Sequence, residues 1–192
     1  MPHRTSGGAF LCKFHCVPKP NQSMDLKTYS GDDLQNFDKN FRREFVNSLS
    51  GAKPAMLVGT TERTKQVHNL SLVSNVLHIG SNPPLMGVLF RPDVVPRHTL
   101  SNIRHNGFFT LNHVSEELVG PAHVASAKYE MQTSEFEASN LQPAFTHTLP
   151  APYVAEAHVQ IGLKLEEQLD IQTNGTHLII GRIIEVRLPE RA

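Results

Sequence analysis

The last third of the chain carries a residue pattern that fits an antiparallel β-hairpin. From 155 to 166, apolar residues occupy the odd positions and mostly polar residues the even ones, a period of two that is typical of a strand with one solvated face. The alternation slips at 166–168, which predicts a β-bulge. Asn174-Gly175 is a hairpin turn signal, and residues 176–189 form the predicted return strand.

Four shorter segments upstream also predict strands. Residues 54–61, 84–92 and 108–114 are apolar runs, and Pro83-Pro84 marks a strand entry because proline donates no backbone hydrogen bond. The fourth segment, 68–84, reads as a strand over 68–79, although Asn and Ser stand where a buried strand would carry Val or Ile. Its small polar residues therefore raise the question of what they face.

Helical patterns appear at three places. Apolar residues at three- and four-residue steps predict one amphipathic helix from 31 to a stop near Gly51. Thr99 is the expected N-cap of a short helix that ends at Gly107, and 115–130 predicts a helix with Pro121 in its first turn. Five or six strands, two or three helices and no alternating βα order predict a mainly β, antiparallel barrel with flanking helices.

Composition limits the function classes. The chain has 192 residues, 18 basic and 18 acidic side chains, and no apolar run of membrane-spanning length. Balanced charge disfavours nucleic-acid binding, and two cysteines indicate a reducing, cytoplasmic setting rather than a disulfide framework. Residues 1–23 lack acidic side chains and are expected to be an N-terminal extension upstream of the true start, followed by a single domain over 24–192.

Motifs for common chemistries do not occur. The sequence contains no Gly-x-Gly-x-x-Gly, no P-loop, no nucleophile elbow and no His-Glu-x-x-His. Eleven histidines show no helical ligand pairing, and Cys12, His15 and Cys16 lack a fourth ligand, so we expect neither a metal site nor a catalytic side chain.

The candidate site residues fall into three clusters of small polar and basic side chains. The first is the strand 68–79 with its asparagines and serines, and the second is Arg97 beside the start of a helix, where free N–H groups favour a phosphate. The third is the segment 123–129. A helix cap and a polar barrel rim would account for the same residues, so the residues alone predict a β-barrel with a candidate anion site.

The order of these motifs resembles the flavin reductase-like family, the FMN-binding split β-barrels, and in particular its flavoredoxin-like branch. The shared pattern is Asn69 to Ser74, Pro83-Pro84, Arg-His-Thr-Leu-Ser-Asn-Ile at 97–103, Gly107, and an aromatic strand ending in Asn112. Residues 126–137 resemble the branch's later loop and helix, and the likeness covers about 45 to 188. A glycine-containing turn before the serine-rich strand, common in NAD(P)H:flavin reductases, is absent here.

The resemblance implies an antiparallel Greek-key split β-barrel that binds FMN near the interface of a homodimer. It also implies a set of cofactor-binding residues: Asn69, Ser71, Ser74, Asn75 and Val76 at the ring and ribityl chain, Arg97, Thr99 and Asn102 near the phosphate or ribityl chain, and His123, Ser126 and Lys128 from a second loop. Small polar side chains suit a flat ring whose pyrimidine edge needs donors and acceptors.

The function implied is an oxidoreductase that takes hydride from NAD(P)H at flavin N5 and passes electrons to flavin or another acceptor. Two alternatives remain open. One is an FMN-containing electron carrier that serves a redox partner protein, and the other is a cofactor-free barrel that acts as an interaction module. No nucleic acid or membrane partner is expected.

Overall fold

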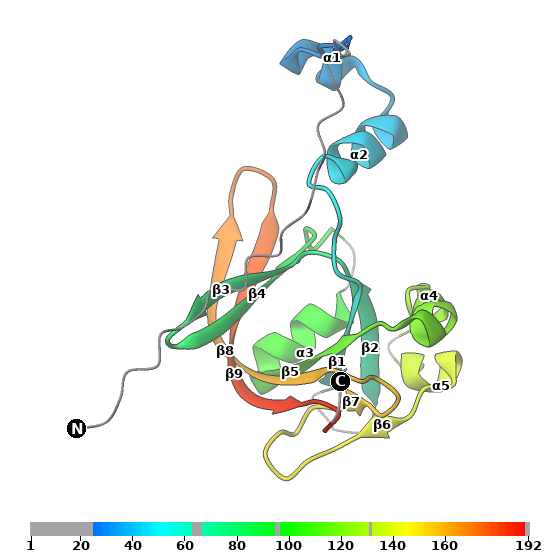
Figure 1. The fold of residues 1–192 in the computed structure, drawn as a ribbon, viewed down its shortest axis with the longest axis vertical. Coiled ribbons are helices and arrows are strands. Elements are labelled where there is room, and N and C mark those ends of the chain that lie inside the picture. Colours follow the sequence, from blue (N-terminus) through cyan, green and yellow to red (C-terminus); the bar gives the residue numbers. More distant parts are fainter. Residues whose placement is uncertain (1–24, 63–66, 95–96, 131, 191–192) are drawn as a thin grey trace, which may run out of the picture. The chain divides into compact units, whose positions relative to one another are not determined.

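The protein is described by a computed structural model that covers residues 25–62, 67–94, 97–130 and 132–190 (Figure 1). The described residues fall into two compact units, one that ends at Leu49 and one that begins at Ser50. All strands of the described residues belong to the second unit.

The first unit contains two helices, α1 (Gly31–Asn36) and α2 (Lys39–Ser48). The single helix predicted over 31–51 is therefore wrong. The backbone becomes extended at Phe37, and a second helix begins after its N-cap residue, Asp38. The Asp38 carboxylate accepts from the backbone N–H groups of Asn40 and Phe41 at 2.9 and 3.2 Å, which caps the second helix. Apolar periodicity continues through the break because Phe37 and Phe41 still pack together, with ring centroids 4.9 Å apart.

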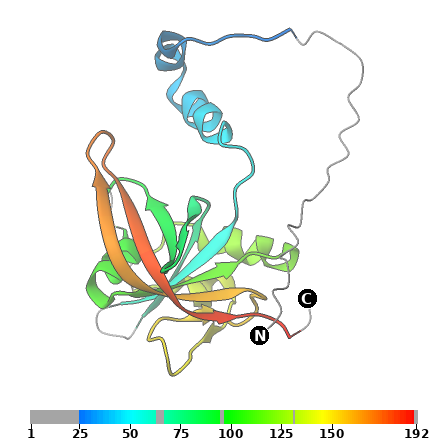
Figure 2. The ribbon, with the colours of Figure 1, turned by 60° about the vertical axis from the view of Figure 1, so that its left-hand side comes forward.

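The second unit is built on one seven-stranded antiparallel sheet (Figure 2). Its strands are β1 (Met56–Thr61), β2 (His68–Val73), β3 (Val76–Ser81), β4 (Pro84–Phe90), β5 (Phe108–His113), β8 (Gln160–Ile171) and β9 (Thr176–Arg187), in the order β2-β1-β5-β8-β9-β4-β3. The short strands β6 (Pro143–Ala144) and β7 (Tyr153–Val154) pair separately. The predicted antiparallel β class is confirmed, and the predicted number of strands was too low for the described residues.

The β8–β9 hairpin confirms the clearest sequence pattern. The pairing register shifts between Leu165 and Glu167, where the alternation slips, and Gly175 in the turn has a φ of 71°. The strand begins at Gln160 rather than at 155. Residues 155–159 instead turn, and the Gln160 side-chain amide fixes that turn by donating to the carbonyls of Val154 and Ala157 at 2.7 and 2.9 Å.

The segment 68–79 is two strands rather than one. β2 ends at Val73, Ser74 and Asn75 form a connection, and β3 begins at Val76. β2 and β3 are the two edge strands of the sheet. Because only two residues join them, the sheet must curl until its two edges lie next to each other at this connection. The Asn75 carbonyl accepts from the Leu89 backbone N–H at 2.9 Å, which fastens the connection to β4.

Helices cover the sheet at two places. Helix α3 (His98–Asn106) places Leu100 and Ile103 in the main core with residues of β1, β4 and β5, and it ends at Gly107, which has a φ of 72°. The 3₁₀ helix η1 (Glu116–Leu118), α4 (Val119–Ala125) and α5 (Glu135–Ser139) pack beside β2 in a second core cluster (Figure 1). Pro121 lies in the first turn of α4, as predicted. The predicted helix over 115–130 is wrong in extent, because the 3₁₀ helix η1 precedes α4 and the chain leaves the helix after Ala125. None of the helices in the described ranges has the length and apolar character that crossing a bilayer requires.

Candidate functional site

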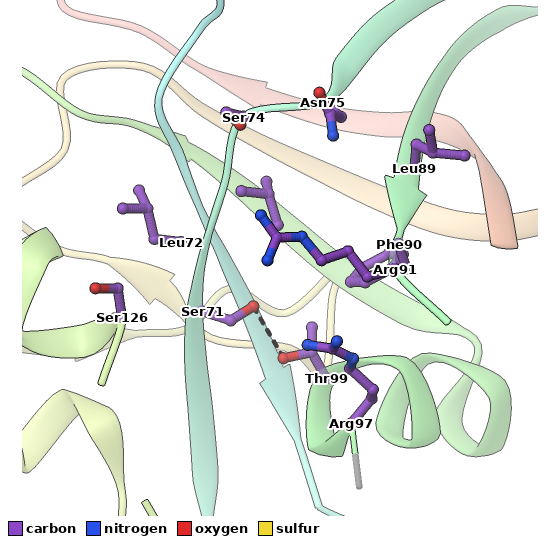
Figure 3. A pocket seen from close by; sticks show the side chains of 11 residues that line it. Ser71, Leu72, Ser74, Asn75, Leu89, Phe90, Arg91, Arg97, Thr99 and Ser126 are labelled. Atoms are coloured by element: carbon purple, nitrogen blue, oxygen red, sulfur yellow. Dashed lines mark hydrogen bonds between the residues drawn. The ribbon is translucent and has the colours of Figure 1, made fainter. Parts of the chain in front are cut away.

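A cavity of about 290 Å³ lies where β2, the Ser74-Asn75 connection, the end of β4 and the start of α3 meet (Figure 3). Six residues proposed from the sequence line it: Ser71, Ser74, Asn75, Arg97, Thr99 and Ser126. The apolar part of the wall comes from Leu72, Val73, Leu89 and Phe90. The wall therefore combines polar and apolar groups, as a half-polar flat ligand requires.

The charged groups that line this cavity in the described chain are two arginines, Arg91 and Arg97, and no carboxylate lines it. Both side chains extend into the space between β2 and the ends of β4 and α3 (Figure 3). The hydrogen bond recorded for Arg97 is long, 3.5 Å from Nε to the Pro92 carbonyl. Guanidinium groups form charge-assisted, bidentate hydrogen bonds with phosphate oxygens, so this wall is suited to an anion.

A second cavity of about 390 Å³ shares Arg97, Thr99 and Ser126 with the first. Asn69 and Lys128 line this second space, which is bordered by α5 and the segment after α4. The two cavities together bring eight of the eleven predicted site residues into one region.

The three other predicted residues line neither cavity. Val76 packs against the main core cluster. Asn102 is buried, and its amide donates to Thr60 Oγ1 at 3.1 Å. His123 has an exposed side chain, while its carbonyl accepts from Ser126 Oγ at 2.6 Å. Their assignment to cofactor binding stays a prediction.

A buried polar network lies behind the cavity wall. Asn69 Nδ2 donates to both carboxylate oxygens of Glu135 at 2.9 Å, and the Leu70 backbone N–H donates to the same group at 3.0 Å. On the other side of the amide, Asn69 Oδ1 accepts from Thr99 Oγ1 at 2.7 Å. Burial raises the pKa of the Glu135 carboxyl, against the lowering effect of these hydrogen bonds.

Thr99 is not the N-cap that the sequence predicts. Helix α3 begins at His98, Arg97 occupies the N-cap position, and no side chain caps this end. The Thr99 hydroxyl is buried and donates to Asn69 Oδ1, a closer and desolvated acceptor, so it does not serve the helix backbone. The helix start is held by the Ser101 backbone N–H, which donates to the Arg97 carbonyl at 3.0 Å.

Sequence reasoning did not find Arg91 and Glu135. Arg91 directly follows the apolar strand β4, and a basic residue after a buried strand was a usable signal. Glu135 lies in a polar stretch 66 residues from Asn69, and no local pattern marks it as buried.

Metal binding has no support in the part of the chain that the structure describes. There, no group of three or more His, Cys, Asp or Glu side chains is placed to hold an ion. Cys12, His15 and Cys16 lie outside the described residues.

A split antiparallel barrel with a basic, half-polar cavity at its edge strands defines a class of small-ligand-binding barrels. The model of the flavin reductase like domain matches residues 50–192, and this chain belongs to the flavin reductase-like family. The matched region starts where the second compact unit starts, at Ser50. The assignment of residues 24–49 to the same domain, and of 1–23 to an N-terminal extension, stays a prediction.

Solved structures agree with this assignment. A candidate flavin reductase with a split barrel domain from Shewanella frigidimarina is 41% identical, with a TM-score of 0.82 over 86% of this chain and 82% of that one. Flavoredoxin of Desulfovibrio vulgaris is 29% identical, with a TM-score of 0.63 over 72% of this chain and 70% of its own. A curated relative from Halalkalibacterium halodurans, itself uncharacterized, is 27% identical over 81% of this chain and 78% of its own length.

Proposed function

We propose that this protein binds FMN in the cavity between β2, β4 and α3 and acts as an NAD(P)H-dependent oxidoreductase. The observation that carries the proposal is the pair Arg91 and Arg97 on a cavity wall without carboxylates, beside the small polar side chains of β2. A phosphate dianion suits the arginines, and a flat ring suits the serines and the adjoining apolar wall. Bound FMN supplies hydride chemistry at N5, and the protein positions it and tunes its electronics.

The residues divide by chemistry. Arg91 and Arg97 would hold the phosphate. Lys128 lines the neighbouring cavity together with the carboxylates of Glu130 and Glu135, so the phosphate is assigned to the arginine-lined cavity. Ser74 and Asn75 are in the connection between two edge strands, outside the regular β ladder, so their side chains are available to the ring or the ribityl chain. We assign no general acid or base, because hydride transfer to a flavin requires none from this wall.

The first experiment is a titration of flavin-free protein with FMN, followed by flavin fluorescence and absorption. Saturable binding at one site, weakened in Arg97→Ala, supports the assignment. NADH and NADPH are then added separately with FMN, and steady consumption of either one identifies an enzyme. Absence of FMN binding to folded protein would refute the proposed function and leave the interaction-module alternative.

The second candidate is an FMN-containing electron carrier, which the similarity to Desulfovibrio flavoredoxin favours. In that case the flavin is held tightly and is reduced by a redox partner protein, not by NAD(P)H. The proposed oxidoreductase would pass its electrons to flavin or another acceptor. We also propose that the protein is cytoplasmic and forms a homodimer. Light scattering with and without FMN measures the oligomeric state.

A further inference from the structure

The Glu135 carboxylate is buried on α5 and contacts β2. Glu135 does not line the cavity of about 290 Å³, but it lines the neighbouring cavity of about 390 Å³. Its side chain is 6% exposed and accepts three hydrogen bonds, two from Asn69 Nδ2 and one from the Leu70 backbone. A carboxylate accepts only, so the atom of Asn69 that faces it must be the NH₂ nitrogen. Glu135 therefore decides which way the Asn69 amide points.

The orientation of Asn69 determines the hydrogen bonds on its other side. Its Oδ1 faces two hydroxyl groups, those of Thr99 at 2.7 Å and Thr60 at 3.2 Å. An amide oxygen cannot donate, so both hydroxyls donate to it. Thr60 Oγ1 in turn accepts from the Asn102 amide at 3.1 Å, which is consistent with the same direction.

The number of hydroxyl protons fixes the hydrogen-bond direction as far as the cavity. Thr99 has a single hydroxyl proton, and that proton is used in the 2.7 Å bond to Asn69. The Ser71 and Thr99 oxygens are 2.9 Å apart (Figure 3), so in this arrangement the Ser71 hydroxyl donates to Thr99. Ser71 has no further proton, and its free lone pairs can only accept from whatever occupies the cavity.

We propose that Glu135 is a positioning residue that, through Asn69 and Thr99, makes Ser71 a hydrogen-bond acceptor toward the bound ligand. The inference rests on the proposed FMN site. The ligand must then offer Ser71 an N–H or O–H donor, and FMN has such donors at its ring N3 and at the ribityl hydroxyls.

Glu135→Gln tests the direction of this chain. Both oxygens of Glu135 lie 2.9 Å from Asn69 Nδ2, so either placement of the glutamine amide brings two NH₂ groups together. Rotation of the Asn69 amide by half a turn exchanges that contact for one between Asn69 Oδ1 and the glutamine oxygen, so Glu135→Gln removes the preference for one orientation. In the rotated molecules the hydroxyls of Thr99 and Ser71 reverse and Ser71 donates toward the ligand's donor. Since only about half of the molecules keep Ser71 as an acceptor, FMN binding should weaken about twofold. Loss of negative charge alone would instead tighten binding of a phosphate dianion, so the two effects have opposite signs.

A double-mutant cycle separates positioning from a structural role. Ser71→Ala alone should also weaken FMN binding about fivefold, and adding Glu135→Gln should cost nothing more because its effect acts through Ser71. Glu137→Gln is the matched control, because this exposed residue lies on the same helix and lines neither of the two cavities. It should leave FMN binding unchanged.

The exchange Asn69→Asp with Glu135→Gln covers the case in which the single variant folds poorly. In this double variant the new aspartate on β2 would accept from the new glutamine amide on α5 and from both threonines. The direction of the chain and its charge are then restored, and wild-type FMN affinity should return. Unchanged binding in Glu135→Gln, multiplicative losses in the cycle, or a folded exchange variant that still binds weakly would each overturn the inference. Wild-type protein that does not bind FMN would instead overturn the proposed function.

Discussion

Arg97→Ala is the most direct perturbation of the proposed phosphate site. Its guanidinium lines both cavities and makes a weak 3.5 Å contact with the Pro92 carbonyl, so few native interactions are lost with it. A hydrogen bond to a charged group contributes about 2 kcal/mol net, which corresponds to about a 30-fold rise in the FMN dissociation constant. The free energy of unfolding of the flavin-free protein should change by less than about 0.5 kcal/mol.

The assay compares FMN with riboflavin, which lacks the phosphate. Arg97→Ala should weaken FMN binding about 30-fold and leave riboflavin binding nearly unchanged. Arg104→Ala is the matched control, because Arg104 lies on helix α3, which directly follows Arg97, and its charge is paired with Asp93 at 2.8 Å, outside the cavity wall. That variant should bind both flavins as the wild type does.

Equal losses for FMN and riboflavin would refute the phosphate assignment, because the arginine would then contact a part that both molecules share. A melting temperature that falls by much more than about 2 °C would show that Arg97 supports the fold.

Three further predictions concern the network and the barrel. Thr99→Val leaves Asn69 Oδ1 with the 3.2 Å bond from Thr60 in place of the 2.7 Å bond, and urea unfolding of the flavin-free protein should show a loss of about 1–3 kcal/mol; a loss near zero would contradict the network. Because burial raises the pKa of Glu135, its carboxyl favours folding below the ordinary glutamate pKa, and that advantage disappears as pH rises through the raised value. The unfolding free energy of the wild type minus that of Glu135→Gln should therefore fall with rising pH across this window, and the opposite slope would count against burial as the main cause. Gly59→Ala would place its Cβ 2.1 Å from the Pro152 carbonyl oxygen and should cost about 3 kcal/mol or more, whereas Gly120→Ala, with open space around its Cβ, should stabilise helix α4 slightly. Thermal denaturation of both glycine variants gives the comparison.

The sequence predicted the parts of this fold that depend on local patterns. The β8–β9 hairpin needs only a period of two and an Asn-Gly turn, and both are visible within about thirty-five residues. The break between α1 and α2 was also encoded locally, since Asp38 is a good N-cap residue, but the regular spacing of the phenylalanines masked it. The assignment of Ser74 and Asn75 to a strand interior failed because their neighbours pair at opposite edges of the sheet, which local sequence does not show.

The candidate site was predictable in position but not in its hydrogen bonding. Family resemblance located the wall formed by Ser71, Ser74 and Arg97, and the structure places these residues around one cavity. Asn69 was expected to face the ring, yet the atoms that decide its orientation belong to Glu135, 66 residues away. Such a contact depends on tertiary packing of α5 against β2, and single-sequence patterns carry no information on it.

The position of the candidate site at the two edge strands bears on how such a barrel can diversify. Each edge strand pairs with one neighbour, β2 with β1 and β3 with β4, while the five strands between them pair on both sides. A substitution near Ser74 or Asn75 therefore disturbs at most the two edge ladders, β1–β2 and β3–β4, and no ladder between interior strands. Ligand preference can drift through mutation at this seam while the interior strands keep the fold, so homologous barrels can acquire new substrates without a new architecture.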